Sequence, residues 1–149
     1  LVLVGHSMGT FIATRYADTY KKSVKHLILI SPPIYTEKDL ENPAFAAAIK
    51  VFRDAVSVKN RKILEEKAFN SSMEKIVLDK KNYKTLANLK TYATLICGDA
   101  DQFIAAFNLP KVLAENPKYL TAIKTIGRHG VSRDKYSKMV NVLEKILNA

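Results

Sequence analysis

The first nine residues decide the fold: the apolar run Leu1-Val2-Leu3-Val4 is followed directly by Gly5-His6-Ser7-Met8-Gly9. An unbroken, partly β-branched apolar run predicts a strand over residues 1–4 that is buried on both faces, as in a parallel sheet. Residues 9–20 come next and predict a helix. Its apolar stripe consists of Ile12, Ala13, Tyr16 and Ala17. The order is therefore strand, glycine-flanked serine, helix.

The glycine-flanked serine has the G-x-S-x-G spacing of a nucleophile elbow. The chain must reverse within a few residues, so we expect Ser7 in a strained backbone conformation, with its hydroxyl above the carboxyl end of the strand. Gly5 and Gly9 would let the strand and the helix approach closely. The backbone N–H of Met8 would point at a developing oxyanion. The alternative is a serine-containing turn of an unrelated α/β protein.

These residues resemble the nucleophile elbow of the α/β-hydrolase superfamily, and the resemblance covers the chain as the C-terminal part of that fold. It implies an α/β protein with parallel strands, flanking helices and a helical cap insertion. Residues 1–4 would be the fifth of the usual eight strands. Since translation normally begins with Met, we expect a fragment that lacks the N-terminal strands. A processed chain whose first strand is a sheet edge is the alternative.

A serine nucleophile needs a general base, and the base needs an orienting acid. The superfamily order is Ser, then Asp or Glu, then His. His129 lies in a glycine-flanked loop between a predicted strand and a predicted helix, where open α/β sheets carry their chemistry, and it is the predicted base. His26 begins the predicted strand 25–30 and His6 lies within the elbow motif, so both are interpreted as structural.

The acid is expected after the short apolar strand 93–97, where the segment Gly98-Asp99-Ala100-Asp101 offers two carboxylates. The resemblance places the acid at Asp101, which leaves Asp99 as a turn or capping residue. Asp101 would fix the tautomer of His129 and stabilise its charged form. Ala93 stands where the family usually has proline, which departs from the family pattern.

Residues 34–84 contain no convincing strand and predict helices over residues 43–56 and around residues 60–69. In this superfamily an insertion between these strands covers the active site, so we interpret 34–84 as a cap and residues 1–33 and 85–149 as the core domain. Helices that simply cover the sheet are the alternative. Three aromatic side chains are candidates for pocket or core positions, with the core favoured: Phe45, Phe52 and Phe69.

The remaining segments continue the alternation of strand and helix that predicts a parallel sheet. A helix is expected near residues 110–115, a strand over 120–126 and a final helix over 132–148. The apolar face of that final helix consists of Tyr136, Met139, Val140, Leu143, Ile146 and Leu147. Cys97, inside its strand, is interpreted as a small buried hydrophobic residue.

The composition is that of a globular chain, with 48% hydrophobic and 26% charged residues. One cysteine excludes a disulfide scaffold and favours the cytoplasm, and three histidines with that cysteine leave no zinc-ligand cluster. No apolar run reaches the ~18 residues of a membrane span. Of the 24 cations that give the net charge of +10, 19 are Lys, and they are scattered. This pattern favours a solvated surface over nucleic-acid binding.

The sequence therefore predicts a serine hydrolase that acts on an ester or related acyl substrate through an acyl-Ser7 intermediate, without cofactor or metal. A small acyl molecule is the expected partner, and the oligomeric state is not assigned. The second oxyanion donor of the superfamily, which follows its third strand, has no counterpart in this chain. A non-catalytic ligand-binding protein, or an inactive fragment that keeps the fold, is the alternative.

Overall fold

The computed structural model describes residues 1–43, 47, 82–99, 101, 108–125, 127 and 136–148. Four strands form one sheet in the order in which they occur along the chain. They are β1 (Val2–His6), β2 (His26–Ile30), β3 (Tyr92–Gly98) and β4 (Leu120–Thr125). Every neighbouring pair is parallel. All four carboxyl ends therefore lie at one edge of the sheet, and the predicted α/β class is confirmed.

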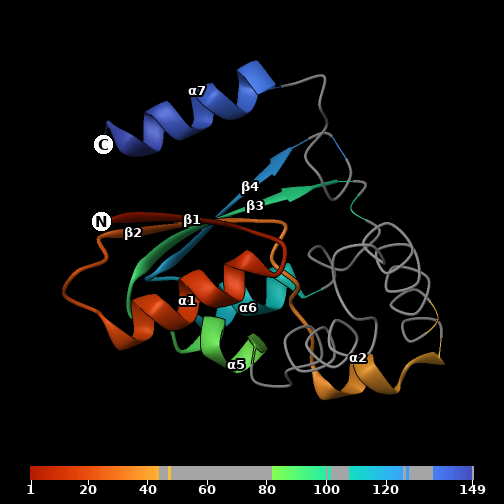
Figure 1. The fold of residues 1–149 in the computed structure, drawn as a ribbon. Helices are drawn as coiled ribbons and strands as arrows, with labels where there is room; N and C mark the ends of the chain where they lie inside the picture. Colours follow the sequence, from red (N-terminus) through yellow and green to blue (C-terminus); the bar gives the residue numbers. More distant parts are fainter. Residues whose placement is uncertain are drawn as a thin grey trace, which may run out of the picture.

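Helices lie on both faces of this sheet (Figure 1). On one face lie α1 (Gly9–Thr19), α5 (Asn82–Ala87) and α6 (Leu109–Glu115). Helix α1 packs on β1 and β2, and α5 packs between α1 and α6. Helix α7 (Tyr136–Leu147) lies on the opposite face, and the short α2 (Glu37–Glu41) follows β2. The layers place the elbow between sheet and α1.

The core is centred on β2 and β3, the two inner strands. Leu27, Leu29 and Leu95 are completely buried there, and Ala17 of α1 and Val112 of α6 cover them at 0% exposure. Fully burying one leucine side chain contributes roughly 1.5–3 kcal/mol. Cys97 is 2% exposed and belongs to the same cluster, as expected for a small hydrophobic residue.

Strand β1 is an edge strand among the described residues, and this corrects the expectation of burial on both faces. Leu1 is 63% exposed, Val2 38% and Val4 57%, although Gly5 is buried. The apolar run identified the strand correctly. It predicted more burial than the structure shows, because β1 pairs only with β2 in the described sheet.

The buried face of α1 also differs from the predicted stripe. Ile12 is 67% exposed and Tyr16 is 40% exposed, while Ala13 and Ala17 are buried as expected. The face that meets the sheet consists of small and hydroxyl-bearing residues with one aromatic ring: Thr10, Phe11, Ala13, Thr14 and Ala17. Hydroxyls fit this buried face because they can hydrogen-bond within the helix, as Thr14 Oγ1 does to the Thr10 carbonyl at 2.7 Å.

The other predicted elements agree with the structure to within about two residues wherever the structure describes them. Of the predicted helix over 43–56 the structure describes only residues 43 and 47, both helical, and the predicted helix around 60–69 lies outside the described residues, as do Phe45, Phe52 and Phe69. The expected domain boundary between residues 84 and 85 falls inside α5. In α7 the predicted apolar face is only partly buried, because Val140 is 47% and Leu147 58% exposed.

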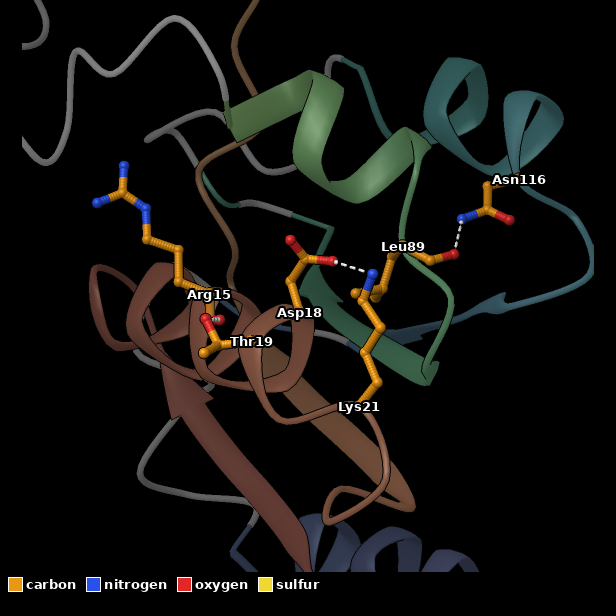
Figure 2. Close-up of polar contacts among 6 residues, drawn as sticks. All are labelled: Arg15, Asp18, Thr19, Lys21, Leu89 and Asn116. Carbon is orange, nitrogen blue, oxygen red and sulfur yellow. Dashed lines mark hydrogen bonds and ion pairs between the residues drawn. The ribbon is translucent and has the colours of Figure 1, made fainter.

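Polar contacts at the far end of α1 and between α5 and α6 are structural (Figure 2). Lys21 pairs with Asp18 at 3.2 Å, and both side chains are more than half exposed, so the pair contributes at most about 1 kcal/mol. Asn116 is buried, and its Nδ2 donates to the carbonyls of Leu86 (3.1 Å) and Leu89 (2.9 Å). These two bonds fix the end of α6 to the last turn of α5 and to the segment that follows it. In the described part of the chain, no helix is long and apolar enough to cross a membrane.

Candidate active site

Ser7 follows the last residue of β1 and has a positive φ of 52°, which is strained for a non-glycine residue. Its N–H donates to the carbonyl of Ile30 on β2 at 2.9 Å. Its own carbonyl accepts the Thr10 N–H at 3.0 Å and the Thr10 hydroxyl at 2.6 Å. The expected strained turn is present, and hydrogen bonds to the sheet and to α1 hold both sides of the Ser7 backbone.

The two elbow glycines do different things. A Cβ on Gly5 would lie 2.6 Å from the Gly9 carbonyl oxygen and 2.8 Å from the Thr10 Cα, so only glycine fits at position 5. A Cβ on Gly9 would meet no described atom within 4 Å. The close approach of strand and helix therefore depends on the missing side chain of Gly5, while Gly9 contributes its backbone as the surface that Gly5 meets.

Met8 is the residue that caps the amino end of α1, with φ −57° and ψ −31°. The N–H groups of Thr10 and Phe11 donate to the carbonyls of Ser7 and Met8. Among the described residues, the Met8 N–H donates to no backbone carbonyl. An amide at the beginning of a helix is a natural donor to an anion.

The two carboxylates after β3 have different environments. Asp99 is exposed, and its Oδ1 accepts the Gly127 N–H at 2.9 Å, which joins the turns after β3 and β4. Asp101 is only 5% exposed, and its N–H donates to the Gly98 carbonyl at 3.2 Å. Asp99 thus has the turn role that the sequence assigned to it, and Asp101 is the buried acid at the carboxyl edge.

The charge of Asp101 acts on two buried neighbours. Burial and then the Asp101 carboxylate raise the pKa of the Tyr35 phenol. The same two causes raise the pKa of the Cys97 thiol to about 12, against the smaller opposing effect of Lys124. A carboxylate that acts on groups this deeply buried lies among them in a region of low dielectric, where its interaction with a charged partner is strong.

The three histidines have separate locations. His129 lies outside the described residues and follows β4 in the sequence. His26 begins β2, so it lies at the amino edge of the sheet, about 13 Å along a five-residue strand from the carboxyl edge. Its Nε2 is 2.9 Å from Thr94 Oγ1, and burial lowers its pKa. His6 is the exposed last residue of β1. The position of His26 at the amino edge agrees with a structural role, whereas the structural role of His6, which lies beside Ser7 at the carboxyl edge, stays a prediction.

A polar cluster that the sequence reasoning missed fixes the segment after β2. Asn108 Nδ2 donates to the Ile34 carbonyl at 2.8 Å and to Asp39 Oδ2 at 2.7 Å. The same Asp39 oxygen accepts the N–H and the hydroxyl of Thr36, each at 2.7 Å. Burial tends to raise the pKa of Asp39, but these hydrogen bonds and the charge of Lys111 lower it overall. The Thr36-x-x-Asp39 spacing is a helix-capping pattern that could have indicated half of this cluster.

Comparison with known proteins agrees with this geometry. The sequence model of the family described as alpha/beta hydrolase fold matches residues 1–56, the segment that contains β1, the elbow, α1 and β2. An esterase of Pyrococcus furiosus superposes on 99% of this chain and 52% of its own, with a TM-score of 0.67 and 19% identity. This chain has the alpha/beta-hydrolase fold. A carboxylesterase of Nitrososphaera gargenis superposes on this chain with the same TM-score, at 17% identity, over 99% of this chain and 64% of its own.

A curated relative with higher identity matches only a short segment. The mouse (Lyso)-N-acylphosphatidylethanolamine lipase is 53% identical over 32 residues, which is 22% of this chain and 9% of the relative. The chain thus spans about half to two thirds of the solved structures and aligns with a small part of the lipase. The predicted fold is confirmed.

Proposed function

We propose that this alpha/beta-hydrolase chain carries the catalytic residues of a serine hydrolase that cleaves an ester or related acyl bond. The main observation in support is the strained backbone of Ser7, which has a φ of 52° and lies between β1 and the amino end of α1. Strain of this kind in a non-glycine residue persists only where its surroundings impose it. The buried Asp101 at the same edge of the sheet supports an acid partner there.

In the proposed reaction, His129 accepts the Ser7 proton while Ser7 Oγ attacks the substrate carbonyl carbon. The Met8 N–H stabilises the resulting oxyanion. The tetrahedral intermediate collapses, the bond to the alcohol breaks, and His129 returns the proton to the leaving oxygen. A water molecule then repeats the sequence on the acyl-Ser7 ester and releases the acid. Asp101 holds the His129 ring and stabilises its charged form throughout.

The substrate class rests on the relatives. The curated relative is named a lipase for (lyso)-N-acylphosphatidylethanolamine, and two of the solved structures are described as esterases. We therefore propose an acyl ester substrate. Residues 34–84 are proposed as the cap over it, anchored at their beginning by the hydrogen bonds of Asn108 to Ile34 and Asp39. A cytoplasmic location stays a prediction.

The direct test is hydrolysis of a p-nitrophenyl ester by the protein and by its Ser7→Ala variant. We expect Ser7→Ala to lower kcat by on the order of 10⁴–10⁶, because the nucleophile is lost. Ser23→Ala is the matched control: Ser23 is an exposed serine in the turn between α1 and β2, and kcat should stay within about twofold. Ester turnover that survives in Ser7→Ala contradicts the proposal. Tight ligand binding without turnover in the unaltered protein would instead favour a non-catalytic binding protein.

A further inference from the structure

Ser31 lies next to Ser7 at the carboxyl edge of the sheet. The parallel register pairs His6 with Ile30, so the residues that follow each of them leave the sheet side by side. Ser31 is completely buried, at 0% exposure. It is a buried polar residue beside the proposed nucleophile, and the proposed triad does not use it.

The backbone of Ser31 is unusual in the same way as that of Ser7. Its φ is 48°, and among the described residues only these two non-glycine residues have a positive φ. A glycine would adopt this conformation without strain. Pro32 follows, and proline drives the preceding residue toward extended conformations. Two local preferences therefore oppose the conformation of Ser31, and the surrounding structure must impose it.

One peptide group connects Ser7 to the inner strand β3. The Ile30 carbonyl accepts the Ser7 N–H at 2.9 Å, and the Ser31 N–H donates to the Ile96 carbonyl at 2.8 Å. These two groups belong to the same planar unit, so a rotation at Ser31 also moves the Ile30 oxygen that holds Ser7. Ile96 is completely buried on β3, which has a paired strand on each side. The peptide group is thus anchored to a rigid part of the core.

We propose that Ser31 is a positioning residue for Ser7: its bent, buried backbone holds the Ile30 carbonyl that fixes the nucleophile at the edge of the sheet. The inference rests on the proposed function of Ser7, and Ser31 itself contacts no reacting atom. Its Cβ limits the alternative conformations of the Ile30–Ser31 peptide group, whereas a glycine at this position would keep the observed φ and add others, so that only the two hydrogen bonds would hold the group.

The test is Ser31→Gly, which keeps the observed φ accessible and removes the restriction. We expect kcat and the rate of fluorophosphonate labelling of Ser7 to fall together by about tenfold, because a small displacement of a reacting group is costly in rate. KM should stay within about twofold, and Tm should change little, since relief of the strained φ offsets the greater freedom of glycine in the unfolded chain. Ser23→Gly, at an exposed position, is the matched control and should change none of these quantities.

A second variant, Ser31→Ala, keeps the Cβ and removes the hydroxyl. Under the proposal it retains kcat to within about threefold. An unchanged kcat and labelling rate in Ser31→Gly would overturn the proposal. So would a loss of activity that parallels a loss of folded protein, or an equal loss in Ser31→Ala. If the unaltered protein is not labelled at Ser7, the proposed function itself has failed. If it is labelled and Ser31→Gly matches it, this inference alone has failed.

Discussion

The two edges of the sheet differ in how far their residues depart from ordinary conformational preferences. At the amino edge, side chains of regular strands contact one another across the sheet. His26 Nε2 lies 2.9 Å from Thr94 Oγ1, and Thr94 Oγ1 lies 3.2 Å from Thr121 Oγ1. At the carboxyl edge Ser7 and Ser31 have positive φ, and Asp101 is a buried carboxylate. Unfavourable features collect at functional sites because selection for activity maintains them. The contrast supports the proposal that the chemistry takes place at the carboxyl edge and that the amino edge contributes to stability.

The largest expected effect separates two carboxylates at the carboxyl edge. Asp101→Asn should lower kcat by on the order of 10⁴, because the amide no longer selects the productive His129 tautomer. Asp99→Asn is the matched control. Asp99 is exposed and accepts the turn N–H of Gly127, so kcat should stay within about threefold. Ester hydrolysis assays on both variants test this difference, and an equal loss of kcat in the two would contradict Asp101 as the acid.

The second prediction compares the two elbow glycines. Gly5→Ala places a Cβ 2.6 Å from the Gly9 carbonyl oxygen, so strand and helix must separate. We expect the free energy of unfolding to fall by about 1–3 kcal/mol and ester turnover to fall with it. Gly9→Ala meets no described atom and should change stability by less than about 1 kcal/mol. Urea denaturation of both variants measures the difference, and equal losses would contradict the structural distinction.

The smallest effect is expected at the amino edge. Burial lowers the pKa of His26 in the folded protein. As the pH falls below the ordinary value of 6.5, the unfolded chain therefore binds a proton at His26 before the folded protein does. Stability should therefore decrease from pH 7 to pH 5, and His26→Gln should lose less over that range. Urea denaturation at the two pH values measures this change. Ester turnover at pH 7 should stay within about twofold, because His26 lies far from Ser7. A large loss of kcat in His26→Gln would contradict the proposal that only the carboxyl edge takes part in the reaction.

The sequence predicted the strands and the elbow because these depend on local patterns. The short apolar runs of β1, β2 and β3 indicate strands, and the G-x-S-x-G spacing needs only a few neighbouring residues. Features that depend on distant parts of the chain were not predictable. The position of β1 at the edge depends on which strands pair with it. The contacts of Asn108 join residues 69 and 74 positions apart. The positive φ of Ser31 was not predictable either, because a residue before proline favours an extended backbone.

The proposed mechanism requires Ser7 to be activated by a base and an acid at the carboxyl edge of the sheet. The most direct measurement is to treat the protein with a fluorophosphonate probe, locate the adduct by mass spectrometry, and compare it with His129→Ala. We expect a single adduct on Ser7 of the unaltered protein, with labelling slowed by at least ~10³ in His129→Ala. An adduct on another serine, or equally fast labelling of Ser7 without His129, would contradict it.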